Sequence, residues 1–383
     1  MNGYLVDEKN IRLKKFIEEM KLSGINLTFI TSSVNIYYFT GILITPYERL
    51  VALLILENGE TFIFIPKLEE ERVKKESKKL TQHLEIISWN DNENAVLKLN
   101  NAVKKLNISS ISSIAVEKKN INLAIFENIS DAFHNIKWEN ADGILENLRL
   151  LKSEEEVKYI NSAVTYTDKA FEYFFKYLKP GKRESEMVDT VSTYFKKLGT
   201  RIWDSYFNVQ VVSGEKSANP HGIPGRRKIK KGDFVTLDMG VKVNGYCSDM
   251  TRTFIVGDYS NKQREIYETV INAQIAAINI VKPGIPIQKV DEAARSYIES
   301  KGYGRYFIHR IGHGIGLEVH EKPSLSAQNK NLLKEGMVFT IEPGIYIPEI
   351  GGVRIEDDIL VTKKEAKVMG NYPKDFENCV KSI

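Results

Sequence analysis

Two stretches of the chain repeat one pattern: KGDFVTLDMG at residues 231–240 and EGMVFTIEPG at residues 335–344. When they are aligned, glycines fall on glycines near both ends, a threonine falls on a threonine, and Asp238 falls on Glu342. A period of about 103 residues is too long for a solenoid repeat. Two copies therefore predict two halves related by a pseudo-twofold axis, which puts these two carboxylates in equivalent places.

Each copy of the repeat is preceded by a pair of predicted helices. Ser153 with Glu156, and later Ser260 with Gln263, form capping boxes that satisfy free backbone N–H groups at a helix start. Each of these long helices ends at Lys-Pro-Gly, and the shorter helix after it ends near a glycine. Helices followed by strands in both halves predict a second, α+β domain over residues 146–383.

The first 145 residues carry a different pattern, in which helical and strand periodicities alternate. Asn58-Gly59 lies between two apolar runs, and it is a strong hairpin signal because both residues tolerate positive φ. Residues 67–79 and 94–106 have the pattern of surface helices. Residues 1–145 are therefore expected to form a separate α/β domain, which serves assembly or shapes a substrate cleft.

The composition is that of an ordinary soluble globular protein, with 42% hydrophobic and 27% charged residues. A net charge of +4, without a basic stripe interleaved with aromatic residues, argues against nucleic-acid binding. The N-terminus lacks the pattern of a secretory signal, and the longest apolar run, residues 50–56, is too short to span a membrane. Cys247 and Cys379 are too few for a disulfide framework, so a cytoplasmic location is expected.

The first copy contains a predicted hairpin that carries two carboxylates. Asn244-Gly245 suggests a two-residue turn in which Val243 pairs with Tyr246. That register makes Asp238 and Asp249 diagonal neighbours on one face, about 7–8 Å apart at the backbone. Because unpaired carboxylates in such a place repel each other and are costly to desolvate, cations are expected between them.

The second copy repeats the arrangement with glutamates. Glu342 lies on its first strand and Glu356 on its second, around a loop expected at residues 348–352. A five-residue loop places both side chains on one face, whereas a four-residue loop would need a bulge to do so. Four carboxylates then converge on one axis, and a pair of divalent ions about 3.5–4 Å apart would remove their repulsion.

Histidines supply the remaining candidates for the site. His313, flanked by glycines in GHGIGLEVHE, is expected to be a fifth ligand, because glycine allows close approach of the backbone. His221 and His320 each precede one of the hairpins and could donate or accept protons in a cleft. His309 has no motif support and is interpreted as structural. Arg354, close to the second glutamate in sequence, is expected to orient a ligand carboxylate.

These motifs resemble, in type and order, those of the pita-bread metallopeptidases, specifically the branch that contains prolidase and aminopeptidase P. The resemblance covers about residues 150–374 and is carried by SGEKSANPHG, LDMG with GYCSDMTRTF, GHGIGLEVHE, TIEPGIY and GGVRIED. Residues 1–145 are similar to the smaller creatinase-like α/β domain that precedes the catalytic domain in these enzymes. The resemblance implies a pita-bread catalytic domain with an internal pseudo-twofold repeat.

The resemblance also implies a role for each ligand. Asp238 would bind one metal ion, His313 and Glu342 would bind the other, and Asp249 and Glu356 would bridge the two. The ions in such enzymes are typically manganese or cobalt, with zinc or iron in some relatives. A ligand set that is rich in oxygen and holds one imidazole suits manganese on chemical grounds and leaves zinc open.

Catalytic roles implied by the resemblance fall on His221, His320 and Glu342. The implied reaction is hydrolysis of the bond between an N-terminal residue and proline in short peptides. His320 would stabilise the oxyanion, and Glu342 would carry a proton to the proline nitrogen. Relatives commonly assemble through the N-terminal domain, so a homodimer is expected. Candidates for its interface are Tyr37, Tyr38 and Tyr47.

Within this branch the sequence favours an Xaa-Pro aminopeptidase over an Xaa-Pro dipeptidase (prolidase). A strict dipeptidase must bind a free carboxylate directly after proline, which an arginine fork does best. Prolidases typically place that arginine between the second cleft histidine and the first metal glutamate, and residues 321–341 contain none. Arg226, Arg227 or Arg354 could still reach the position from another loop.

Two metal-free alternatives are creatinase-like hydrolases and non-catalytic pita-bread binding modules. Both replace the metal ligands, whereas all five are present in this chain. Methionine aminopeptidases keep the ligands but usually lack a full α/β domain in front of the catalytic one. The ligand set therefore favours a peptidase with two metal ions.

Overall fold

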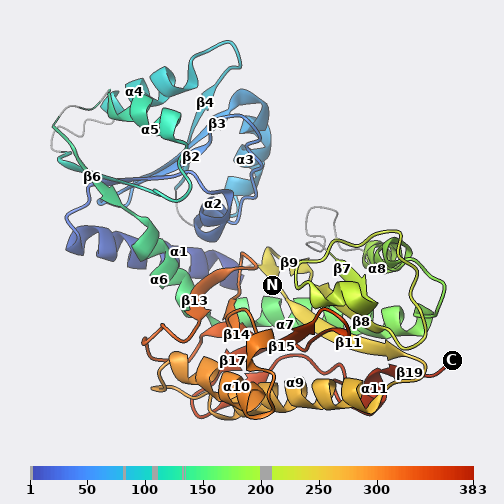
Figure 1. Cartoon of the computed structure of the whole chain (residues 1–383). Coiled ribbons are helices and arrows are strands. Elements are labelled where there is room, and N and C mark those ends of the chain that lie inside the picture. The colour runs from blue at the N-terminus through green and yellow to red at the C-terminus, as the bar shows by residue number, and fades with distance from the viewer. Residues whose placement is uncertain (1–2, 81–82, 106–110, 132, 134, 199–208) are drawn as a thin grey trace. The chain divides into compact units, whose positions relative to one another are not determined.

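The computed structural model of the chain describes residues 3–80, 83–105, 111–131, 133, 135–198 and 209–383 (Figure 1). The chain divides into two compact units, Met1–Arg149 and Leu150–Ile383, called unit 1 and unit 2 below. Among the described residues, no helix has both the length and the apolar character needed to cross a membrane. The C-terminal end of the helix expected at residues 94–106 lies outside the described residues.

Unit 1 is an α/β domain built on one six-stranded sheet, which confirms the fold class expected for it. Its strands are β1 (Leu27–Ile30), β2 (Ala52–Leu56), β3 (Thr61–Pro66), β4 (Glu85–Trp89), β5 (Ser113–Val116) and β6 (Lys137–Asn140). Their order is β4-β3-β2-β1-β5-β6; β2 is antiparallel to both neighbours and the other pairs are parallel. The expected hairpin joins β2 to β3, and Gly59 adopts a φ of 97° in its turn.

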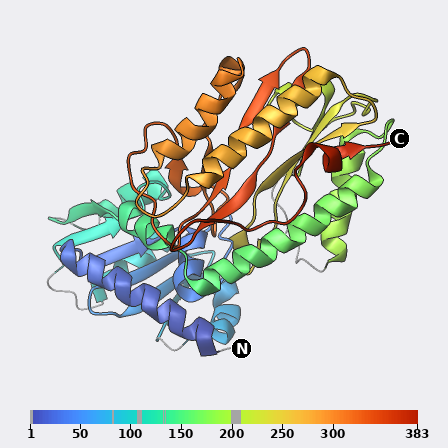
Figure 2. The ribbon, with the colours of Figure 1, turned by 90° about the horizontal axis from the view of Figure 1, so that it is seen from below.

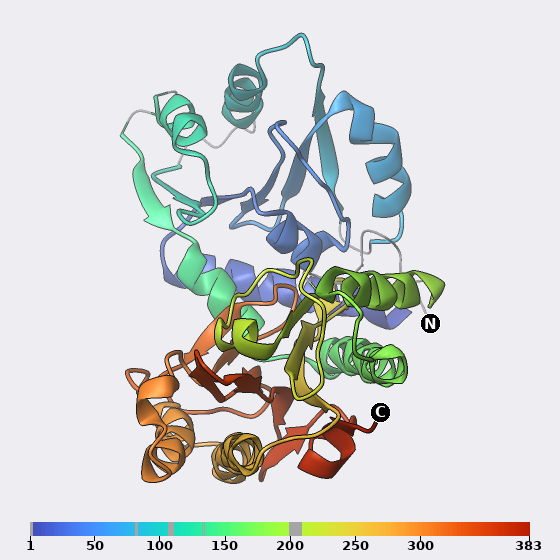
Figure 3. The ribbon, with the colours of Figure 1, turned by 45° about the vertical axis from the view of Figure 1, so that its right-hand side comes forward.

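Helices cover both faces of this sheet. They are α1 (Gly3–Leu22), α2 (Ser33–Thr40), α3 (Glu70–Ser77), α4 (Ala95–Lys105), α5 (Leu123–Ser130) and α6 (Asp142–Leu150). The crossovers through α3 and α5 run toward opposite edges of the sheet, and right-handed crossovers then place them on opposite faces. Figure 3 shows α3 on one side of the strands and α4 and α5 on the other. Leu99 and Val103 of α4 and Ile129 of α5 pack into the core there.

Unit 2 consists of two halves that repeat the same order of elements. The first contains α7 (Glu154–Tyr177), α8 (Glu184–Lys197), β7 (Gln210–Ser213), β8 (Phe234–Met239), β9 (Lys242–Val243), β10 (Tyr246–Cys247) and β11 (Met250–Val256). The second contains α9 (Asn261–Asn279), α10 (Gln288–Ser300), β12 (Gly312–Gly314), β13 (Glu321–Leu325), β14 (Val338–Ile341), β15 (Gly344–Ile347), β16 (Gly351–Arg354) and β17 (Asp357–Val361). The chain ends with β18 (Ala366–Val368), α11 (Phe376–Cys379) and β19 (Val380–Lys381).

Each half contributes a sheet with helices packed against it. The strand orders are β19-β11-β8-β7 and β13-β12-β14-β17-β18. Helix α7 contacts β9, β10 and β11, and its counterpart α9 contacts β14, β15 and β16. Figure 2 shows α9 and α10 lying across the strands of this unit. Both expected capping boxes are present, at the starts of α7 and α9. These elements confirm the α+β fold with an internal repeat.

The register of the first hairpin agrees with the sequence prediction. Val243 pairs with Tyr246, and Asp238 pairs with Thr251 further along the same two segments. Both pairs belong to one unbroken register, so Asp238 and Asp249 are diagonal neighbours on one face. The Asn244-Gly245 turn has positive φ at both residues, which a two-residue hairpin of this type requires.

The second hairpin has a shorter loop than the sequence suggests. Ile347 pairs with Gly351, so the loop spans residues 348–350 and the expected loop at 348–352 is wrong. Gly351 adopts a φ of 116°, a conformation that glycine tolerates and that turns the chain early. The same register sets Glu342 and Glu356 directly opposite each other, so both still share one face.

Candidate metal centre

Five acidic and imidazole side chains from both halves of unit 2 converge on one pocket. They are Asp238 in β8, Asp249 directly before β11, His313 in β12, Glu342 directly after β14 and Glu356 directly before β17. All five line a pocket with a volume of about 980 Å³. Strand ends from the two repeat copies thus bring together the residues that the sequence singled out as ligands.

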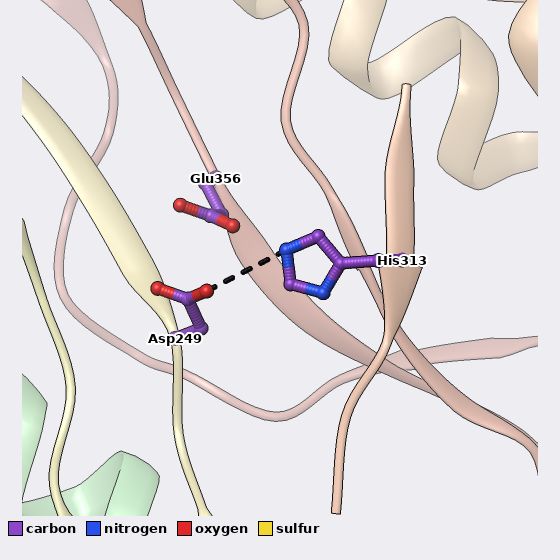
Figure 4. A group of neighbouring side chains, drawn as sticks. All are labelled: Asp249, His313 and Glu356. Carbon is purple, nitrogen blue, oxygen red and sulfur yellow. Dashed lines mark ion pairs between the residues drawn. The ribbon is translucent and has the colours of Figure 1, made fainter. Parts of the chain in front are cut away.

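The inner part of this pocket holds a compact group of three donors. Ligand atoms of Asp249, His313 and Glu356 lie within 4.8 Å of one another, and all three residues are buried (Figure 4). His313 Nε2 lies 3.6 Å from Asp249 Oδ2 and 3.4 Å from Glu342 Oε1. His313 Nδ1 lies 3.3 Å from the carbonyl oxygen of Gly314. A proton on Nδ1 that is donated to this carbonyl leaves the Nε2 lone pair free for an ion.

Glycines on both sides of His313 are required by close backbone packing. A Cβ atom at Gly312 would overlap the carbonyl oxygen of Thr340, and one at Gly314 would overlap that of Lys322. Because these obstacles are backbone atoms, they cannot move aside as a flexible side chain would. The GHG sequence is therefore what lets β12 pack closely beside its neighbours and carry His313 into the site.

Burial and mutual repulsion shift the pKa values of the candidate ligands. Burial, followed by the charges of neighbouring carboxylates, raises the pKa of Asp249 and of Glu356 well above the usual range. Burial raises the pKa of Glu342 to about 7 and lowers the pKa of His313 to about 3. A nearby divalent cation favours ionised carboxylates and a neutral imidazole, so this donor set fits such an ion.

Hydroxyl and guanidinium groups orient the carboxylates. Thr251 Oγ1 donates to Glu356 Oε2 over 2.6 Å, and Thr340 Oγ1 donates to Glu342 Oε1 over 3.3 Å. Arg354 Nη2 donates to Asp238 Oδ2 over 2.7 Å. Sequence analysis anticipated this arginine but missed both threonines. The signal for Thr340 was its position two residues before Glu342, which puts both side chains on one face of the strand.

The histidines of the sequence analysis also lie in this pocket. His221 and His320 both line it, and the ring centroids of His320 and His313 are 4.2 Å apart. Burial, followed by the positive charge of Arg310, lowers the pKa of His320. His309 lines the pocket too, and its Nε2 lies 2.9 Å from the Tyr346 hydroxyl.

Cys247 does not belong to the donor set. Its side chain is fully buried and its Sγ lies 3.7 Å from the carbonyl oxygen of Leu317. Burial raises the pKa of the Cys247 thiol to about 12, which disfavours a thiolate. It does not line the pocket and packs in the core.

Three arginines of unit 2 were considered from the sequence as partners for a substrate carboxylate, and only one of them lines the pocket. Arg227 pairs with Asp233, and neither Arg226 nor Arg227 lines the pocket. Arg354 lines it but is bonded to Asp238. Arg310, which sequence analysis overlooked, lines it as well. The only sequence signal for Arg310 was its position three residues before His313 in HRIGHGIG.

Comparison with known proteins identifies the family of both parts of the chain. Residues 158–363 match the model of Metallopeptidase family M24, and residues 12–151 match that of the Creatinase/Prolidase N-terminal domain. The Bacillus subtilis (strain 168) protein named "Putative dipeptidase YkvY" is 43% identical over 95% of this chain and 99% of its own length.

Solved structures of two peptidases share the whole architecture. An Xaa-Pro dipeptidase from Bacillus anthracis is 34% identical, with a TM-score of 0.88 over 97% of this chain and 99% of its own. An X-Pro aminopeptidase from Thermotoga maritima MSB8 is 29% identical, with a TM-score of 0.85 over 96% of this chain and 99% of its own. These matches confirm the pita-bread fold and the resemblance to the Xaa-Pro peptidases. The chain is a metallopeptidase and belongs to family M24, with a creatinase/prolidase N-terminal domain ahead of its catalytic domain.

Proposed function

We propose that this metallopeptidase is an Xaa-Pro dipeptidase that cleaves the bond between an N-terminal residue and a C-terminal proline. The sequence favoured an Xaa-Pro aminopeptidase, but relatives named as dipeptidases support the alternative better. The observation that carries the proposal is the pocket itself, where five potential ligands and three further imidazoles converge. Such a concave site suits a small substrate.

The proposed ligands are Asp238, Asp249, His313, Glu342 and Glu356, and they would hold two divalent ions. When bound, ions of this kind act as Lewis acids toward a carbonyl group and lower the pKa of water. Four carboxylates with one imidazole favour manganese among the candidates, with cobalt or zinc as alternatives. The residues of the chain would hold the ions, orient the peptide and move protons.

Three residues would act directly on the substrate. His320, beside the ring of His313, would donate a hydrogen bond to the carbonyl oxygen of the scissile bond as negative charge develops there. His221 lies across the pocket on the loop after β7 and would bind or protonate the peptide. Glu342 would carry a proton to the proline nitrogen, so that the nitrogen leaves as a neutral amine and not as a strongly basic anion.

Assembly as a homodimer is also proposed. The aromatic cluster considered for an interface separates in the structure, because Tyr38 is buried and Tyr47 is 75% exposed. Tyr38 therefore packs in the core of unit 1, where its ring lies 5.3 Å from that of Phe39. Tyr47 is therefore the exposed member of this group that remains a candidate for the interface.

The proposed activity is tested by comparing two substrates that differ only in length. We expect kcat/KM for an Xaa-Pro dipeptide to exceed that for the same sequence extended by one residue by about tenfold or more, because a bidentate arginine–carboxylate contact has that order of strength. An Xaa-Ala dipeptide measures the requirement for proline. Equal or faster cleavage of the tripeptide would show an aminopeptidase instead.

A further inference from the structure

Among the described residues, one cation that lines the pocket, Arg310, forms no ion pair. Arg354 is nearly buried and its guanidinium is committed to Asp238, Tyr346 and Thr251. Arg310 is exposed and lines the same pocket, yet it forms no ion pair with a carboxylate in the part of the chain that the structure describes. An arginine that lines a substrate pocket with its charge uncompensated is suited to bind an anionic group of the ligand.

The position of Arg310 is set by the strand pairing next to the metal centre. Arg310 Nη1 donates a hydrogen bond of 3.2 Å to Ser324 Oγ. Ser324 lies in β13 and is the register partner of His313 in β12. Arg310 thus reaches residues 321–341, where the sequence shows no arginine, from a loop that precedes His313.

The remaining donors of Arg310 are available to a ligand. A guanidinium carries five N–H donors, and the contact with Ser324 uses one of them. Three of the four carboxylates of the pocket contact other groups of opposite character: Asp238 pairs with Arg354, and Asp249 and Glu342 lie beside the imidazole of His313. Charge in the pocket is therefore divided between an acidic region that suits cations and a basic position at Arg310 that suits an anion.

We propose that Arg310 binds the free α-carboxylate of the C-terminal proline in the dipeptide substrate, with Ser324 holding the guanidinium in place. This inference rests on the proposed dipeptidase function and names the residue that would make the enzyme specific for dipeptides. A guanidinium holds both oxygens of a carboxylate in a planar fork, which a lysine cannot reproduce. The same contact would fix the scissile carbonyl near His320, which lines the same pocket as Arg310.

The test uses one substrate with the carboxylate and one without it. For the metal-loaded enzyme, we expect Arg310→Ala to lower kcat/KM for an Xaa-Pro dipeptide by about 10–100-fold, the usual strength of a charged hydrogen bond. Cleavage of the corresponding dipeptide amide should change by less than about threefold, because the amide offers no carboxylate to the guanidinium. Arg310→Lys should recover part of the loss. Arg226→Ala is the matched control, because Arg226 is exposed and lies outside the pocket. This variant should leave kcat/KM unchanged for both substrates.

A binding measurement separates this inference from the proposed function. Calorimetry with a non-cleavable, reduced-bond Xaa-Pro analogue should show weaker binding by Arg310→Ala when the analogue has a free carboxylate, and unchanged binding when it is amidated. If the wild-type enzyme prefers tripeptides while this binding difference persists, the dipeptidase function fails and the carboxylate site stands. Equal losses for acid and amide, or no loss for the acid, would overturn the role of Arg310. Metal content is measured for every variant, and a loss of metal in Arg310→Ala would likewise overturn it.

Discussion

Arg354 Nη2 lies 2.7 Å from Asp238 Oδ2, and this ion pair joins the two repeat copies at the edge of the metal centre. The arginine side chain is only 6% exposed and also donates to Thr251 Oγ1 and the Tyr346 hydroxyl. One planar group therefore holds the carboxylate of Asp238 together with two buried hydroxyl groups. An arginine can do this because its donors point in several fixed directions.

The first prediction concerns this ion pair. Arg354→Lys keeps the charge, but an ammonium on a flexible stem cannot contact all these groups at once. We expect a loss of about 10–100-fold in kcat/KM or in metal affinity, the range seen when partners of metal ligands are changed. Arg264→Lys on α9, where the arginine pairs with Glu268 at the surface, is the matched control. Unchanged activity and metal content in Arg354→Lys would show that the pair has no orienting role.

A second prediction addresses the number of metal ions. Fully loaded protein should contain about two divalent ions per chain and lose activity to a chelator. Glu356→Gln should lower both metal content and rate, because Glu356 is proposed to bridge the two sites, and elemental analysis of the purified variant measures this. Glu349→Gln is the matched control, since Glu349 is exposed in the loop between β15 and β16 and lies outside the pocket. Normal activity in rigorously metal-free protein would contradict the proposal that the enzyme needs divalent ions.

The architecture of unit 2 was predictable because each half carries the same sequence signals for it. Both copies carry a capping box, a Lys-Pro-Gly helix stop and a strand ending in an acidic residue, and the structure places these elements in equivalent positions. The first hairpin was predictable from Asn244-Gly245, since a two-residue turn fixes the register. The second was not, because Pro348 and the glycines at 351 and 352 are compatible with loops of several lengths.

Arg310 was not predictable, for a reason that lies in the strand pairing. It is 14 residues from Ser324 in sequence, and the two meet only because β12 and β13 pair as an antiparallel hairpin. That pairing contains a register shift between His313 and Gly314, which no local sequence signal specifies. The guanidinium of Arg310 therefore reaches residues 321–341 from the preceding loop, without a local sequence signal for this contact.

The pKa values of the carboxylates predict how metal binding depends on pH. The pKa of Glu342 is about 7 in the folded protein without metal, above the value of about 4.3 expected in the unfolded chain. Between these values the folded state binds more protons, so the stability contributed by this group falls as pH rises from about 4.5 through 7. A metal ion displaces those protons, so its affinity rises with pH over the same range.

The measurable consequence is a larger thermal shift at higher pH. The gain in Tm on adding Mn²⁺ should be greater at pH 7.5 than at pH 5.5, because tighter binding to the folded state stabilises it more. Calorimetric titration near pH 6, repeated in buffers with different ionisation enthalpies, should show release of protons on binding. An equal Tm gain at both pH values, or a larger one at pH 5.5, would contradict the raised pKa of Glu342.

The proposed homodimer predicts a concentration-dependent sedimentation coefficient. Tyr47→Ser should shift the equilibrium toward monomer if the exposed ring contributes to the interface, while leaving unfolding of the chain unchanged. Tyr259→Ser is a control of the same chemical kind, because Tyr259 is also exposed but lies in unit 2. A wild-type protein that sediments as a monomer at micromolar concentration would refute the dimer.

The last prediction separates proton carriers from metal ligands among the pocket histidines. His221→Ala and His320→Ala should fold normally and keep their metal, because neither residue belongs to the three-donor group around Asp249. Each should still lose at least about tenfold in kcat, since groups that donate protons or hydrogen bonds in a transition state contribute about 10²–10⁴-fold. His83→Ala, an exposed histidine of unit 1, should match wild type in every measurement. His320 is the sharper case, because its ring lies 4.2 Å from that of His313 and could instead support the ligand. If His320→Ala lost metal in proportion to activity, and activity returned when excess Mn²⁺ was added, its role would be to hold His313 in place and not to act on the peptide.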